Sequence, residues 1–172
     1  MARSDYLFKT CFEGTTKNFI TVLLYSFKST MKTYCSSKNN RKNDFILLGK
    51  CVNKPNAKKV IHRELLKYID VIQRAKYVKP AQKGLGYACC DYFRLMHDIE
   101  KGLQNDCTEK RIKIVQEFVQ NLMQPLIDIA CGDYTDESDA CTKLAVLPKK
   151  KKNEKTYGSF LLPLVDLWNH LD

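Results

Sequence analysis

The eight cysteines are the side chains of this sequence whose type and number most directly imply chemistry. Their number is even, which is typical of disulfide-bonded proteins that fold in an oxidising compartment. A cytosolic protein with buried thiols is the alternative. A zinc site is disfavoured because no C-x2-C pair occurs and because His62, His97 and His170 lie far apart. We therefore expect up to four disulfides among Cys11, Cys35, Cys51, Cys89, Cys90, Cys107, Cys131 and Cys141.

Acidic side chains cluster after Gly132 and could in principle bind calcium, which prefers six or more oxygen ligands. The cluster comprises Asp133, Asp136, Glu137 and Asp139. Its spacing does not match an EF-hand loop, and capping of a short turn over 138–145 explains it more simply. We expect no metal ion.

The Cys89-Cys90 pair followed by His97-Asp98 is similar to the active-site helix of secreted phospholipases A2. In that family the His activates water and the Asp binds calcium, and the pair follows the cysteines by about one helical turn. Here the pair comes two turns later, and no cysteine-framed, glycine-rich loop precedes it. We expect His97 to be a partly buried surface residue. Because G-x-S-x-G, P-loop and dinucleotide motifs are also absent, we predict no enzyme, no catalytic residue and no cofactor.

The net charge of +10 is unevenly distributed. Residues 1–80 carry an excess of twelve positive charges, and residues 81–146 carry an excess of four negative charges. Four consecutive lysines, Lys149, Lys150, Lys151 and Lys152, form either an exposed loop or a site for an anionic surface or polyanion. We do not expect nucleic-acid binding, because no helix combines a basic face with interleaved aromatic residues.

Apolar residues recur at the spacing of one-sided helices and not in strand-like alternation. This pattern predicts helices over 15–34, 43–51, 56–78, 86–105 and 108–130, and a final helix within 159–172. Pro55 and Pro80 bracket one helix, Thr108 can cap another, and Gly132 suits the position after its end. Pro125 should kink that helix or start a new one.

The predicted fold class is all-α: an irregular bundle of five to seven helices cross-linked by up to four disulfides. We divide the chain into a disulfide-linked domain over 1–146, a basic linker over 147–158 and a C-terminal helix within 159–172 that packs on the same domain. No apolar stretch of about 18 residues occurs, so we expect no transmembrane segment.

Helix length limits which cysteines can pair, because a helix rises about 1.5 Å per residue and a disulfide needs Cα atoms within about 7 Å. Cys107 and Cys131 lie at opposite ends of one predicted helix and should not pair with each other. The same argument excludes Cys11 with Cys35 and Cys90 with Cys107. If 86–105 and 108–130 form an antiparallel hairpin, two bridges form among Cys89, Cys90, Cys131 and Cys141. Cys11, Cys35, Cys51 and Cys107 supply the others.

The order and sequence context of these cysteines resemble those of a group of arthropod secreted proteins. The group includes insect haemolymph glycoproteins and cysteine-rich proteins of ticks, mites and spiders. The resemblance spans about residues 11–144 and is most specific over 126–144, with Ile129-Ala130-Cys131-Gly132 and Ser138-Asp139-Ala140-Cys141. The adjacent Cys89 and Cys90 look more like the arachnid members. The resemblance implies an extracellular, all-helical, non-enzymatic protein.

Two functions are compatible with this sequence, and both assume a secreted protein whose signal peptide has been removed. The first is a binding module for a hydrophobic ligand or a partner protein, in which the amphipathic helices part around an apolar cavity. The second is a structural or adhesive protein that acts through its basic surface on an anionic matrix. Five aromatic residues could line such a cavity: Phe27, Tyr92, Phe93, Phe118 and Trp168. Packing in the core is the simpler interpretation of these residues.

Overall fold

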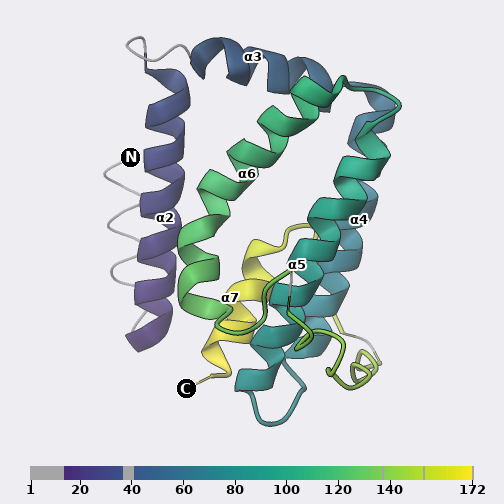
Figure 1. Cartoon of the computed structure of the whole chain (residues 1–172). Helices are drawn as coiled ribbons and strands as arrows, with labels where there is room; N and C mark the ends of the chain where they lie inside the picture. The colour runs from purple at the N-terminus through teal and green to yellow at the C-terminus, as the bar shows by residue number, and fades with distance from the viewer. Residues whose placement is uncertain (1–13, 37–40, 137, 153, 172) are drawn as a thin grey trace.

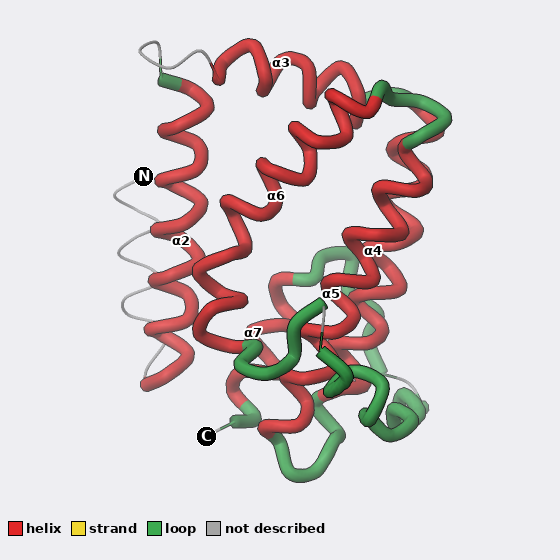
Figure 2. The backbone as a smooth tube through the Cα atoms, viewed as in Figure 1, coloured by secondary structure: helices red, strands yellow, loops and turns green. Residues whose placement is uncertain are grey.

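The structure, a computed structural model, describes residues 14–36, 41–136, 138–152 and 154–171. Within these ranges it contains helices, turns and loops but no strand (Figure 2). The described part of the chain forms six helices: α2 (Gly14–Cys35), α3 (Arg41–Val52), α4 (Pro55–Ala75), α5 (Gln82–Leu103), α6 (Glu109–Ala130) and α7 (Leu161–Asn169). The predicted all-α fold class is confirmed.

Two helix pairs form the body of the bundle, and a shorter helix lies at each end (Figure 1). α4 packs along α5, while α2 packs along α6. α3 lies across one end and contacts α2, α4 and α6. α7 lies at the other end against α2 and α4. The buried core runs between these elements, and its most completely buried side chains include Phe19, Tyr34, Ile72, Leu103 and Leu167.

The α4–α5 pair is close because a glycine stands at one contact between the two helices. A Cβ atom added at Gly102 would lie 2.4 Å from Cγ1 of Val60, which is far inside van der Waals contact. The predicted start of α4 is correct to one residue, but the helix ends three residues before the predicted limit of 56–78. The helix begins at Pro55, where the missing N–H has no intrahelical partner to lose, and it ends at Ala75, before Pro80.

α6 continues through Pro125 instead of restarting there. A proline has no N–H, so the carbonyl of Asn121, four residues earlier, loses its helical partner. Two hydroxyls of α2 lie against it: Thr30 Oγ1 donates to the Asn121 oxygen at 3.2 Å, and Ser26 Oγ, 3.3 Å away, shares its single proton between this oxygen and the next carbonyl. Ser26 Oγ also donates to the carbonyl of Leu122 at 2.6 Å. These buried polar contacts join α2 to α6 at the proline.

The ends of α6 follow the sequence prediction. Thr108 occupies the N-cap position with extended backbone, although its side chain makes no capping hydrogen bond. Gly132 follows the helix with φ of +49°, the left-handed conformation that favours glycine after a helix end. The segment 138–145 contains turns and no helix among its residues.

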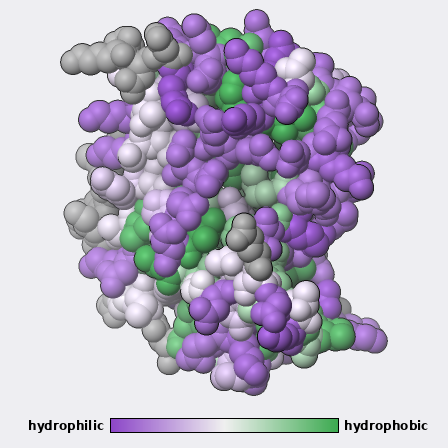
Figure 3. All heavy atoms as spheres, in the orientation of Figure 1, coloured by the Kyte–Doolittle hydropathy of each residue, from purple (hydrophilic) through white to green (hydrophobic). Residues whose placement is uncertain are grey.

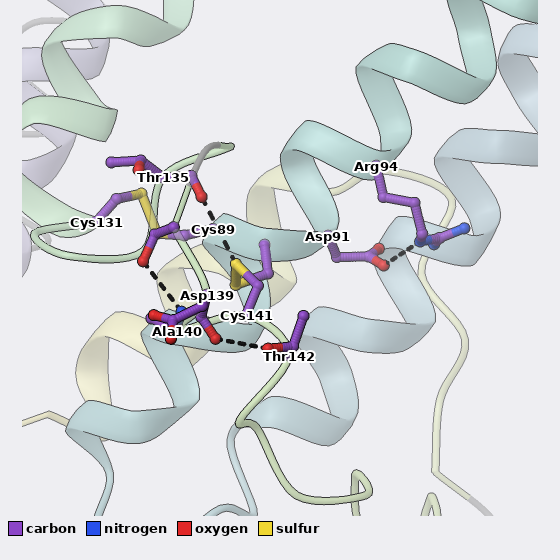
Figure 4. Close-up of a disulfide and its surroundings, with 11 residues drawn as sticks. Cys89, Asp91, Arg94, Cys131, Thr135, Asp139, Ala140, Cys141 and Thr142 are labelled. Atoms are coloured by element: carbon purple, nitrogen blue, oxygen red, sulfur yellow. Dashed lines mark hydrogen bonds and ion pairs between the residues drawn. A yellow bond between two sulfur atoms is a disulfide. The ribbon is translucent and has the colours of Figure 1, made fainter.

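Three disulfides cross-link the described helices: Cys51–Cys107, Cys89–Cys131 and Cys90–Cys141. The last two are the predicted pair of bridges among four cysteines. Figure 4 shows Cys89 bonded to Cys131, and Cys141 nearby, where the segment after α6 folds back on α5. The bonds close loops of 56, 42 and 51 residues. Loop-closure entropy gives each bond about 4 kcal/mol of stabilisation through the unfolded state.

The prediction that Cys35 joins a disulfide is wrong. Its thiol is free and exposed at the end of α2. The physical reason is that Cys51 and Cys107, two of its candidate partners, bond to each other. Cys11, which helix length already excludes as a partner of Cys35, lies outside the described residues.

Alkylation of the folded, unreduced protein should label Cys35, because its thiol is exposed, and should leave the three bonded pairs unlabelled. Peptide mapping by mass spectrometry measures this outcome, and a sample reduced in denaturant, in which every cysteine is labelled, is the control. Labelling of Cys51 or Cys107 in the unreduced protein would contradict the assigned pairing.

Candidate ligand-binding cavity

An apolar cavity lies where α3, α4, α5 and α6 diverge. Its volume is about 330 Å³. All four helices contribute side chains to its wall, and Phe160, just before α7, contributes one more. The lining residues are Leu48, Val52, Ile61, Leu65, Tyr68, Tyr92, Leu95, Met96, Ile99, Val115, Phe118, Val119, Leu122, Met123 and Phe160.

The cavity is open to the surface on one side. Six lining residues, among them Tyr68, Leu95 and Val115, are buried and form its inner wall. The other nine, among them Met96 and Val119, are partly exposed and form its rim. Figure 3 shows a hollow near the middle of the face of Figure 1, where hydrophobic atoms lie below a frame of hydrophilic ones.

Disulfides fix both ends of the helices that flank the cavity. Cys89 in the first turns of α5 bonds to Cys131 at the end of α6, with a Cα–Cα distance of 5.6 Å. At the opposite end, Cys107 in the α5–α6 connection bonds to Cys51 of α3, with a Cα–Cα distance of 5.4 Å. These bonds oppose any sliding of the helices that would close the space between them.

The wall of the cavity is apolar except for the phenol groups of Tyr68 and Tyr92. No charged side chain lines the cavity. Burial raises the pKa of Tyr92 to about 12, and burial, followed by the nearby charge of Asp91, raises the pKa of Tyr68. Both phenols therefore stay protonated, and neutral, at any physiological pH.

A second, smaller cavity of about 40 Å³ adjoins the first. Tyr68, Tyr92 and Met123 line both. On its far side it reaches Trp168 of α7, whose ring stacks on Phe19 of α2 at 4.5 Å between centroids. The indole Nε1 of Trp168 is buried and has no hydrogen-bond partner among the described residues.

The aromatic residues predicted as cavity lining are placed differently from one another. Tyr92 and Phe118 line the main cavity, and Trp168 lines the smaller one. Phe93 packs against the core but lines neither. Phe27 is 48% exposed on α2 and lines neither cavity, because α2 directs Ser26 and Thr30 toward α6 instead.

Most of the remaining residues that line the main cavity belong to the apolar stripes from which the helices are predicted. The apolar positions that predict the helices include Tyr92 in 86–105 and Val119 in 108–130, but not Val52, Leu95, Met123 or Phe160. Leu95 and Met123 could have been found from periodicity, since they lie three residues after Tyr92 and four after Val119. Phe160 could not, because it stands outside the helices and reaches the cavity only through the fold.

The segment predicted as a basic linker is fastened to the C-terminal end of α4. Arg74 donates to the carbonyls of Pro148 and Leu147 at 2.8 and 3.1 Å. Gln73 donates to the carbonyl of Lys155 at 2.7 Å. Lys76 Nζ lies 2.7 Å from Glu154 Oε1, and both side chains are largely buried. This segment leads to Phe160 and so positions one wall of the cavity.

The four-lysine run is partly used within the protein. Lys150 Nζ donates to Gln73 Oε1 at 2.8 Å, and Lys151 Nζ lies 4.5 Å from the centre of the Tyr77 ring. Lys149, Lys151 and Lys152 are exposed. Two of the four predicted polyanion-binding lysines thus have contacts on α4 and the turn after it.

The other residues weighed for catalysis or metal binding lie on the surface. His97 is exposed on α5, and Asp98 accepts a hydrogen bond from Arg94 at 3.2 Å. Arg94 also donates to Asp91 at 2.6 Å, as Figure 4 shows. Over the described ranges, no group of three or more His, Cys, Asp or Glu side chains could hold a metal ion.

Fold and cavity together define a disulfide-linked, all-helical protein with an apolar cavity between its helices. No protein-family model, no curated protein and no solved structure matches the chain. The arthropod resemblance therefore stays a prediction. No helix in the described part of the chain has the length and apolarity needed to cross a bilayer.

Replacing Glu154 by Gln should lower the free energy of unfolding by about 2 kcal/mol at neutral pH, because it leaves the largely buried Lys76 with only the longer contact to Asp166 at 3.4 Å. Burial alone would raise the pKa of Glu154, but hydrogen bonds from Lys76 and Tyr77 outweigh it, and the net pKa is lowered. A carboxyl whose pKa falls on folding stabilises the protein above its unfolded pKa and loses this effect as the pH falls through its folded pKa.

The difference in free energy of unfolding between the wild type and Glu154→Gln should therefore shrink as the pH falls below about 4. Denaturant unfolding of both proteins from about pH 7 to pH 3 measures this difference. Other acidic groups, such as Glu64, titrate in both proteins, so their contributions cancel in the difference between the two free energies of unfolding. A difference that stays constant over this range would contradict the assignment.

Proposed function

We propose that this chain is a non-enzymatic, secreted binding protein that holds a hydrophobic small molecule in the cavity between α3, α4, α5 and α6. The observation that supports this most directly is the cavity itself, about 330 Å³ lined by apolar and aromatic side chains. Small-molecule sites are typically concave, mostly apolar and upwards of about 300 Å³.

The volume indicates the size of the ligand. A water molecule occupies about 30 Å³ in the liquid, so the cavity holds roughly eleven such volumes. A methylene group takes up about as much space as a water molecule. The best-fitting ligand is therefore a medium-length aliphatic or terpenoid molecule of about ten carbon atoms. Each methylene group that leaves water contributes about 0.8 kcal/mol to binding.

The disulfides support both the extracellular setting and the binding role. Structural disulfides persist outside the cytosol, and the three bonds described here are compatible with secretion. Two of them fix the ends of the helices beside the cavity, so less conformational freedom is lost when a ligand enters. The arthropod resemblance points in the same direction.

The alternative function, adhesion through the basic surface, has less support. It depends on exposed, unengaged cations, whereas Lys150 and Lys151 contact Gln73 and Tyr77 of the same chain. We do not propose it as a second function.

A cavity-filling variant tests the proposal. Val119→Trp should weaken binding of the neutral dye N-phenylnaphthylamine at least tenfold, because Val119 is on the rim and an indole there occupies space that the dye needs. Fluorescence titration of the oxidised protein measures the affinity. The cavity can accept the larger side chain, so the variant should fold normally.

The matched control is Ile129→Trp on the same helix, where the side chain is 55% exposed and lines neither cavity. This control should bind the dye as the wild type does. Equal affinity of Val119→Trp and the wild type, or no saturable dye binding by the wild type, would refute the proposed function.

A further inference from the structure

Trp168 Nε1 is a buried hydrogen-bond donor that lacks an acceptor within the described residues. Native proteins give almost all such groups a partner, because a buried N–H without one destabilises the folded state. Trp168 lines the smaller cavity, whose volume of about 40 Å³ is close to that of one water molecule, about 30 Å³. The space fits one small polar group, such as a hydroxyl or a carbonyl oxygen.

The smaller cavity adjoins the larger one. Three side chains, Tyr68, Tyr92 and Met123, separate the two and line both. The two tyrosines are only 4% and 7% exposed. Met123 is unbranched and flexible, and such a side chain can move to let a ligand pass. A chain-like molecule in the larger cavity can therefore reach Trp168 with its inner end.

Neither cavity offers a partner for a charged ligand group. Their linings contain no Lys, Arg, His, Asp or Glu side chain. A carboxylate carried inward would lose its hydration without gaining a cation, which strongly disfavours binding. A neutral oxygen needs only a donor, and the Trp168 N–H is available.

We propose that the ligand is an uncharged aliphatic or terpenoid molecule with a single oxygen function, such as an alcohol, aldehyde or ester, that accepts a hydrogen bond from Trp168 Nε1. Its hydrocarbon part fills the larger cavity. This inference rests on the proposed function and specifies the class of ligand that the same site takes.

Three probes of equal chain length test the ligand class: decane, 1-decanol and decanoate. Displacement of N-phenylnaphthylamine at pH about 7.5 should rank 1-decanol as the tightest. Decanoate should bind more weakly, because its carboxylate either is buried without a cation or stays in water at the open rim and leaves Trp168 Nε1 without an acceptor. Trp168 is the only tryptophan in the chain. Its own emission should therefore change when 1-decanol binds in the absence of dye.

Trp168→Phe tests the hydrogen bond, since it keeps an aromatic ring on Phe19 and removes the N–H. It should weaken 1-decanol binding about three- to tenfold, the effect of one neutral hydrogen bond. Decane has no acceptor, so its affinity should fall by less than that of 1-decanol, and this difference between the two ligands measures the hydrogen bond. Circular dichroism of the variant shows that it is folded.

The outcomes separate this inference from the proposed function. If wild type and Trp168→Phe bind 1-decanol equally while both bind the dye, the cavity is a binding site but the hydrogen bond is wrong, and a water molecule accounts for the Trp168 donor. Equal affinity for decanoate and 1-decanol would overturn the assignment of an uncharged ligand. Absence of any dye binding by the wild type would refute the proposed function itself.

Discussion

The Cys89–Cys131 and Cys51–Cys107 bonds hold the two ends of the α5–α6 hairpin, and the arrangement between them depends on this constraint. Apolar helices in water tend to close on one another, because every exposed methylene group is unfavourable. Helices that are fixed at both ends cannot slide or tilt freely to do so. The space that remains between them is the apolar cavity, and α3 and α4 complete its wall.

Polar contacts then hold the remaining elements around this hairpin. Pro125 frees a carbonyl of α6, and the hydroxyls of Ser26 and Thr30 bind it from α2. The largely buried ion pair of Lys76 and Glu154 fastens the segment before α7 to the end of α4. Each contact gives a partner to a polar group, so each also specifies where its element packs.

Much of the fold could be predicted from the sequence, because local rules decide it. The apolar stripes give the helices, and Pro55, Thr108 and Gly132 mark their limits. Helix length predicts two bridges among Cys89, Cys90, Cys131 and Cys141 but leaves their pairing open, and the structure forms Cys89–Cys131 and Cys90–Cys141. The bond between Cys51 and Cys107, and with it the free thiol of Cys35, depends on how α3 lies across the bundle, which no local pattern encodes.

The sequence by itself determined the helical class, the approximate helix limits, most of the residues that face inward and the group of cysteines that meet beside Cys131, since each follows from local spacing. Phe27 and Ile129 follow the apolar spacing as well, yet both are exposed. Only the tertiary structure decided which inward side chains leave a cavity and which fill the core. Tyr92 and Phe93 are neighbours on α5, yet only Tyr92 lines the cavity. The physical reason is that a cavity is the space left between elements, and its shape depends on their separation and crossing, to which all the helices contribute at once.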